Sequence, residues 1–197
     1  MVLSNLSQQF IVYFSPNYFY PEVQERWLPV IKKLSIPYTN VEDFMNAQIQ
    51  SFNLPAINMQ TVNQQWGSYK TTKRGGYNMD QQMDKQLTLT IKLTEGYTSY
   101  FIMRQQIELY YQTIKTKPLY WPPITVDILD DFGHAIITYE QEQITPESIS
   151  DLNLTYAAKL GSYNTFTVGL RYNFFDMWYL DSVTGKMIKQ TQTQIQN

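Results

Sequence analysis

The sequence predicts a mainly β (α+β) fold, an antiparallel β-sandwich or barrel with one flanking helix and an inserted N-terminal helix. Two segments, 87–94 and 165–175, alternate apolar and polar residues with the two-residue period of a strand that buries one face. Two others, 21–34 and 97–114, repeat apolar residues at helical spacing. Strands that alternate in this way suit an antiparallel sheet with one wet face.

Strand and helix follow one another in the N-terminal part of the chain. The aromatic and β-branched run at 10–14 predicts the first strand. A helix is expected to begin at Pro21, because proline is favoured in a first helical turn, and Pro29 is expected to kink it. Further strands are expected near 47–52 and 57–64.

A long polar stretch at 65–85 comes next and contains three glycines and three large aromatic residues. A connection of this length is uncommon in a compact domain and usually has a function. The strand at 87–94 then leads into the helix at 97–114, for which Thr98 or Ser99 is the expected N-cap. The apolar stripe of that helix is expected to include Tyr100 and Tyr111.

The remainder of the chain is expected to be β-structure. A hairpin is predicted from 124–128 and 135–141 around the turn Asp130-Asp131-Phe132-Gly133. A short connection at 145–147 is then followed by strands near 152–156 and 165–175. The chain is therefore expected to form one domain over 1–180, with a helical insertion at 15–46, an extended arm at 65–85 and a polar extension at 181–197.

The composition favours an assembly protein. Charged residues make up only 16% of the chain, below the usual quarter or so, and neutral polar residues replace them on the expected surface. Aromatic residues reach 15%, which suits sheets and protein interfaces. The net charge of −2 argues against a nucleic-acid-binding domain, and the absence of cysteine excludes disulfides and thiolate chemistry. Residues 1–9 have neither a basic nor an apolar region, so no signal peptide is expected, and no apolar run approaches membrane-spanning length.

No constellation of catalytic residues is found, so the protein is expected not to be an enzyme and to need no cofactor or metal. His134 is the only histidine and lies beside the predicted turn, which excludes a Cys-His pair and disfavours a zinc site. The alternative that Asp127, Asp130 and Asp131 hold a cation stays open, although acidic residues at turns are usually just solvated.

Five features in a fixed order resemble the tail tube family of contractile phages, which includes related tubes of secretion and contractile-injection systems and tube-like ring, hub and baseplate proteins. They are Phe52-Asn53-Leu54-Pro55, the arm at 65–85, the strand 87–93 followed by the helix 97–114, the hairpin 124–139 and the closing strand 166–175. The resemblance covers about 47–179. The N-terminal helix and the C-terminal extension depart from the family pattern and favour a specialised ring, hub or baseplate-proximal adaptor as the alternative.

The resemblance implies a structural subunit that forms hexameric or larger rings, stacked into a tube. Subunit edges would pair into a ring-shaped β-barrel, which removes unpaired strand edges. The implied partners are the protein itself, other tail proteins, and double-stranded DNA that passes through during ejection without specific binding. The implied location is the tail of a virion, assembled in the host cytoplasm. A carbohydrate-binding β-module is a further alternative, because exposed tyrosine and tryptophan also stack on sugars.

Two groups of residues are candidates for these roles. The first consists of polar residues expected on the wet face of the sheet as the channel lining, with an ordinary solvated face as the alternative: Thr88, Thr90, Lys92, Thr94, Thr165, Thr167, Arg171 and Asn173. Lys92 and Arg171 are expected to pair with acidic residues of the next subunit. The second consists of arm residues expected to contact the neighbouring ring, with a disordered loop as the alternative: Trp66, Tyr69, Lys73, Arg74 and Tyr77.

Overall fold

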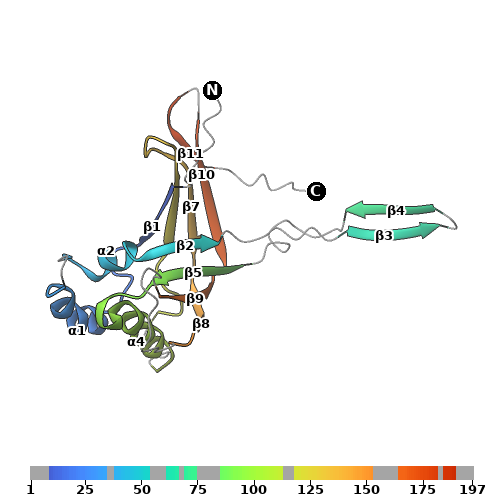
Figure 1. The fold of residues 1–197 in the computed structure, drawn as a ribbon. Helices are drawn as coiled ribbons and strands as arrows, with labels where there is room; N and C mark the ends of the chain where they lie inside the picture. The colour runs from blue at the N-terminus through green and yellow to red at the C-terminus, as the bar shows by residue number, and fades with distance from the viewer. Residues whose placement is uncertain are drawn as a thin grey trace.

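The computed structural model describes residues 9–34, 38–53, 61–66, 69–74, 85–112, 118–152, 164–181 and 184–189. Figure 1 shows two β-sheets, a group of helices beside one of them, and a separate two-stranded hairpin. The helices are α1 (Pro21–Ile31), α2 (Val41–Asn46), the 3-10 turn η1 (Glu95–Tyr97) and α4 (Thr98–Gln112). The strands are β1 (Gln9–Phe14), β2 (Ile49–Asn53), β3 (Thr61–Trp66), β4 (Tyr69–Arg74), β5 (Gln86–Lys92), β6 (Ile124–Leu129), β7 (Ala135–Glu142), β8 (Thr145–Ile149), β9 (Thr165–Arg171), β10 (Phe174–Leu180) and β11 (Met187–Lys189).

All strand pairs are antiparallel among the described residues. The five-stranded sheet has the order β1-β6-β7-β10-β11, and the four-stranded sheet has the order β2-β5-β9-β8. The hairpin β3-β4 pairs with neither sheet. The predicted mainly antiparallel fold with flanking helices is confirmed, while the closure of subunit edges into a ring-shaped barrel stays a prediction.

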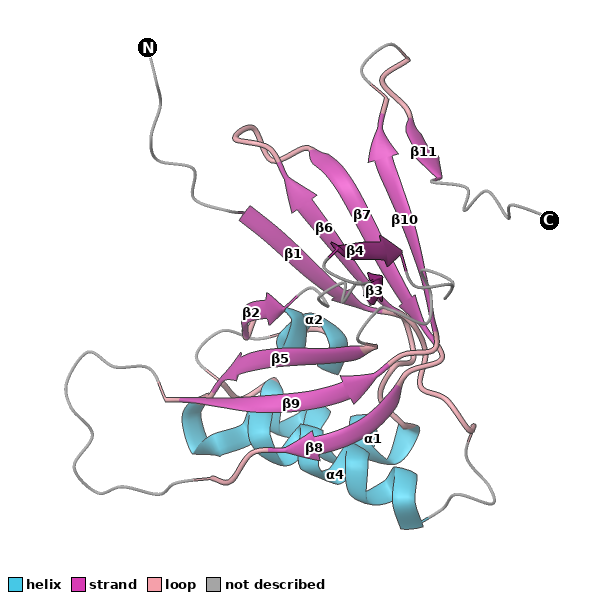
Figure 2. Cartoon of the chain, turned by 90° about the vertical axis from the view of Figure 1, so that its right-hand side faces the viewer, coloured by secondary structure: helices cyan, strands magenta, loops and turns pink. Residues whose placement is uncertain are grey.

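The two sheets are connected by a shared bend. Strands β7 and β10 pair in the first sheet, and their direct continuations β8 and β9 pair in the second. At the bend, the N–H of Asn173 donates to the carbonyl of Glu142 at 3.1 Å, and Gln143 has a positive φ of 54°. Figure 2 shows the strands of the two sheets crossing steeply beyond this bend. The predicted single strand at 165–175 is therefore wrong, because the chain changes sheet at Tyr172-Asn173.

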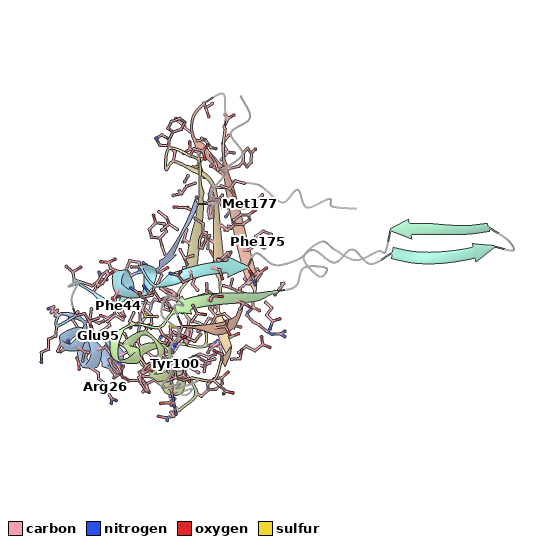
Figure 3. All side chains as sticks on the ribbon, in the orientation of Figure 1. Arg26, Phe44, Glu95, Tyr100, Phe175 and Met177 are labelled. Atoms are coloured by element: carbon pink, nitrogen blue, oxygen red, sulfur yellow. The ribbon has the colours of Figure 1, made fainter. Side chains whose placement is uncertain are left out.

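Helices cover one face of the four-stranded sheet (Figure 2). The buried residues of β5 and β9 alternate as predicted and form the floor of the core: Leu87, Leu89, Ile91, Phe166, Val168 and Leu170. Tyr100 of α4 contacts Phe166 edge-on, with ring centroids 5.3 Å apart. Figure 3 shows Tyr100 and Phe44 within this helical layer. Burial of these side chains against the sheet is the main source of stability here.

The N-terminal helical segment is part of the core. Tyr18, Phe19, Val23 and Phe44 are almost fully buried. Gln106, at the centre of the buried face of α4, accepts the N–H of Tyr20 at 2.9 Å and donates to the carbonyl of Tyr18 at 2.9 Å. This buried amide fixes the segment between β1 and α1 to the long helix.

Several local predictions need correction. Helix α1 runs without interruption through Pro29, and α2 was not predicted. Residues 145–147 belong to strand β8. Tyr111 is 55% exposed, because the buried face of α4 is centred on Gln106. Neither predicted residue caps that helix. Instead, the hydroxyl of Thr94 accepts the N–H of Ser99 at 3.1 Å, and this contact caps α4.

Other predictions lie partly or wholly outside the described residues. Residues 57–60 and 153–156 of two expected strands lie outside the described residues, while residues 61–64 lie within β3. The polar extension contributes β11, which pairs with β10 of the same chain.

Candidate assembly surfaces

The polar face of the four-stranded sheet brings together most of the predicted lining residues. Thr90 of β5 is directly opposite Thr167 of β9, and Thr88 is opposite Gly169. Lys92 is opposite Thr165 at the end of the same strand pair. These residues alternate with the buried ones, so they lie on the side of the sheet away from the helices.

The outer strands extend the same rows of neutral residues. Ser51 and Asn53 of β2 are opposite Thr90 and Thr88. On the other side, Ser148 of β8 is opposite Gly169, and a Cβ atom at position 169 would lie 2.5 Å from the Ser148 Oγ. The absence of a side chain at 169 therefore allows β8 to pack closely on β9. The result is a face rich in hydroxyl groups.

Three of the predicted lining residues have specific partners. The Nε of Arg171 donates to Glu147 of β8 at 3.0 Å, so the acid paired with this arginine lies in the same chain. Thr94 lies beyond the end of β5 and caps α4. Asn173 lies at the bend between the sheets, where its Nδ2 donates to the side chain of Gln143 at 3.1 Å. Thr94 and Asn173 are therefore at the ends of the polar face.

Both outer strands of this sheet have one unpaired side among the described residues. The order β2-β5-β9-β8 leaves β2 at one edge and β8 at the other. Each has an irregularity, at Ile49/Ser51 in β2 and at Pro146/Ser148 in β8. Open edges of this kind expose backbone groups that pair readily with another strand.

The predicted arm contains a regular hairpin. Strands β3 and β4 pair along their whole length, from Thr61 opposite Arg74 to Trp66 opposite Tyr69. Figure 1 shows the hairpin standing apart from both sheets. Its two strands carry Lys70, Lys73 and Arg74 and no acidic residue. Tyr77, the remaining predicted contact residue, lies outside the described residues.

An acidic face on the five-stranded sheet was not predicted from the sequence. Four carboxylates lie on the side of this sheet opposite to its core-facing residues: Asp127, Glu140, Glu142 and Asp176. Glu140 is directly opposite Asp176, and Lys189 donates to Asp176 at 2.6 Å. Burial, together with the negative charges of Glu142 and Asp176, raises the pKa of Glu140, and Lys189 opposes this shift.

Exposed apolar side chains flank these carboxylates. Tyr13 is 42% exposed and Phe174 is 54% exposed, and both lie on the same side of the sheet as Glu140. The one sequence signal for this face was the Glu-Gln-Glu spacing at 140–142, which places both acids on one side of a strand. Exposed aromatic residues among charges are typical of a binding surface.

The side chain of Asp130 holds the turn around His134 in place through hydrogen bonds to the backbone. The side chain of Asp130 accepts the N–H groups of Phe132 at 2.9 Å and His134 at 2.8 Å. The backbone hydrogen bond from His134 is the main cause of the lowered pKa of Asp130. In the described part of the chain, no group of three or more His, Asp or Glu residues is placed to hold a metal ion. No described helix has the length and apolar character needed to cross a membrane.

Comparison with solved structures finds a protein of similar fold. A chain of the cryo-EM structure of the anti-feeding prophage (AFP) baseplate, symmetrised six-fold, matches with a TM-score of 0.51 and 12% identity, over 90% of this chain and 97% of that one. The fold is tail-tube-like, as the resemblance implied. The identity is low, so the likeness concerns the fold.

Two further structures have lower scores. A type six secretion system protein has a TM-score of 0.48 and 11% identity, over 94% of this chain and 93% of that chain. A chain of the sheath-tube complex of the extracellular contractile injection system PVC has a TM-score of 0.46 and 14% identity, over 88% and 90% of the two chains. No family model matches the sequence. No curated protein matches it either.

Proposed function

We propose that this protein is a structural subunit of a tail-tube-like particle, and that copies pair through β2 and β8 to form rings that stack into a tube. The observation that carries the proposal is the four-stranded sheet of this tail-tube-like fold, with its neutral polar face and two open edges. Edge pairing around a ring joins the sheets of successive copies and removes their exposed backbone groups. The protein would then be located in the particle.

The polar face of this sheet suits the wall of a channel. Its central rows consist of hydroxyl and amide side chains, and the charge of Arg171 is paired with Glu147. A wall whose central rows carry no basic residue would hold the phosphates of double-stranded DNA only weakly, because the affinity of proteins for DNA depends on cationic contacts, and Lys92 lies at the end of this face. Passage of DNA through such a tube is thus compatible with the surface, as the tail role requires.

Cysteine cross-linking tests the edge pairing, because the natural chain contains no cysteine. Ser51→Cys and Asn53→Cys on β2 are each combined with Ser148→Cys on β8, since a disulfide requires Cα atoms about 4.4–6.8 Å apart. Mild oxidation should give a ladder of covalent oligomers that ends at one closed species. Mass photometry and negative-stain images of the untreated protein should show rings of the same subunit number.

Single-cysteine variants and the pair Ile11→Cys with Met187→Cys, which lie on the same face of the outer strands of the other sheet, are the controls. They should give no ladder. A ladder from the β1-β11 pair alone would show that the other sheet forms the ring contact. A protein that stays monomeric at high concentration and never cross-links would overturn the proposed function.

The baseplate match favours a second, related role. The AFP baseplate chain is covered over 97% of its length and itself comes from a six-fold symmetrised assembly. A baseplate-proximal ring or adaptor of the same fold would form rings that do not elongate into tubes. Images that show rings of uniform subunit number without stacking, at every concentration, would support this role over that of the main tube subunit.

A further inference from the structure

Most carboxylates on the acidic face of the five-stranded sheet have no ion-pair partner in the part of the chain that the structure describes. Of its four carboxylates, Asp176 accepts from Lys189, and Asp127 accepts the hydroxyl of Thr138 at 2.6 Å. Glu140 and Glu142 have no ion-pair partner among the described residues. Like charges directly opposite each other in a sheet are destabilising, so this face is costly to the isolated subunit.

The cost would be offset by a cationic partner that fits a flat, elongated sheet. Exposed aromatic and aliphatic side chains lie beside the carboxylates, namely Ile11, Tyr13 and Phe174. A partner that carries both basic and aromatic residues on a narrow element would complement this surface. Charge complementarity of this kind sets the register and the partner more than it sets raw affinity.

The β3-β4 hairpin has this composition. It carries Lys70, Lys73 and Arg74 without an acidic residue, and Trp66 and Tyr69 pair across its end. It belongs to neither sheet and stands apart from them in Figure 1. Aromatic residues and arginine are the residue types that contribute most to binding energy in protein interfaces.

Building on the proposed function, we propose that the β3-β4 hairpin of one copy docks on the acidic face of the five-stranded sheet of another copy, and that this contact joins successive rings. The hairpin supplies the positive charge that the carboxylates lack. Edge pairing through β2 and β8 and docking of the hairpin use different surfaces. Ring formation and ring stacking are therefore separable.

Charge reversal of each partner tests the contact. The hairpin variant Lys70→Glu/Lys73→Glu/Arg74→Glu and the face variant Glu140→Lys/Glu142→Lys should each form rings of normal mass. Each should lose stacked assemblies at least ten-fold, measured by negative-stain length distributions and sedimentation. Stacking of the natural protein should also weaken as salt rises from about 0.1 M to 1 M, over which the screening length falls from about 10 Å to about 3 Å.

Mixing the two variants identifies which copies touch. The reversed hairpin of the first complements the reversed face of the second, and each also retains one natural partner surface. A contact between copies predicts that the mixture stacks although neither variant does alone. Docking of the hairpin on its own sheet would restore nothing in the mixture and would overturn the proposal.

Matched control variants reverse the same number of basic or acidic residues on other surfaces of the protein. Arg26→Glu/Lys32→Glu/Lys33→Glu reverses three exposed basic residues at α1, on the outer side of the helical layer where Figure 3 places Arg26. Glu25→Lys/Glu95→Lys reverses two exposed acidic residues. Both should stack normally.

Two outcomes separate this inference from the proposed function. If rings form and stack, but the hairpin and face variants stack as well as the natural protein, the docking proposal is wrong and the ring-forming role stands. If the natural protein forms no rings, the proposed function itself fails. Equal loss of stacking in the matched controls would show a general charge effect and would also overturn the docking proposal.

Discussion

The outward faces of the two sheets differ although one pair of strands runs through both. On β9, the outward residues Thr167 and Gly169 are opposite Thr90 and Thr88 of β5, while Thr165 and Arg171 at the strand ends are opposite Lys92 and Gln86. On its continuation β10, the outward residue Asp176 is opposite Glu140, and Phe174 is opposite Glu142. The bend at Tyr172-Asn173 therefore separates a neutral, hydroxyl-rich surface from an acidic surface with exposed aromatic residues.

This difference separates two demands on an assembly protein. A surface that cargo must pass needs weak, evenly distributed interactions, which hydroxyl groups without unpaired charge provide. A surface that holds a specific partner needs groups that are poorly satisfied until the partner arrives. The neutral face places uncharged residues opposite one another and pairs Arg171 with Glu147 within the subunit, whereas the acidic face has Glu140 directly opposite Asp176.

The largest expected effect on stability comes from Gly169 on the neutral face. Gly169→Val should lower the free energy of unfolding by about 2 kcal/mol, because even a Cβ atom there would lie 2.5 Å from the Ser148 Oγ and overpack β8 against β9. Urea unfolding measures the loss. The double variant Gly169→Val/Ser148→Gly should recover part of it.

Thr167→Val is the control on the same strand. Thr167 is exposed, and its bonds to Ser150 use the backbone, so replacement of its side chain should change the free energy of unfolding by less than about 0.5 kcal/mol. Equal losses at 167 and 169 would show that the neutral face is sensitive in general. The close approach of β8 at Gly169 would then have no special role.

A smaller effect is expected from Lys189, which forms an ion pair on the acidic face. Lys189→Met removes the bond to Asp176 and the position over the Trp178 ring, where the Nζ lies 5.3 Å from the centroid. The pair is partly exposed, so a loss of about 0.5–1 kcal/mol is expected. Chemical unfolding at low and high salt should show the loss shrinking as salt rises.

The exposed pair Arg104–Glu108 on α4 provides the comparison. Arg104→Met should cost less, because this is a well-exposed i,i+4 pair on a helix surface. An equal or larger cost at Arg104 would contradict the view that Lys189 relieves repulsion on the acidic face.

Sequence patterns predicted the elements whose burial is local and regular. The alternation in β5 and the transition from β5 to the helix appear in the structure as expected. The bend did not, because alternation in the sequence continues through Tyr172 to Phe174 while the backbone changes sheet. That change is accompanied by the positive φ of Gln143 and by a hydrogen bond to the carbonyl of Glu142, which lie at the end of β7, about thirty residues earlier in the chain.

The buried face of α4 was missed for a related reason. Hydrophobic periodicity places apolar residues inside, yet the centre of this face is Gln106, whose amide satisfies backbone groups of Tyr18 and Tyr20. A polar residue that is buried because distant backbone needs it carries no local signal. The same holds for the acidic face, where Glu140 and Asp176 become neighbours only through the β7-β10 register.

The smallest expected effect tests the origin of the acidic face's instability. Glu140→Gln should raise the free energy of unfolding of the monomer by about 0.5 kcal/mol at neutral pH, because it removes a carboxylate directly opposite Asp176. The same variant should weaken ring stacking. A substitution that stabilises the subunit while it weakens assembly would show that the charge serves binding.

The pH dependence of that gain follows from the raised pKa of Glu140. A carboxyl whose pKa is raised in the folded protein destabilises it when ionised, so its cost is full above the folded-state pKa and disappears below the ordinary pKa of glutamate. Natural protein and Glu140→Gln should therefore differ most at neutral pH and converge as the pH falls through the raised value. Thermal unfolding across this range measures the convergence. A difference that grows on acidification would mean that Glu140 stabilises the face when ionised, and the contrast between the two sheets would then need another cause.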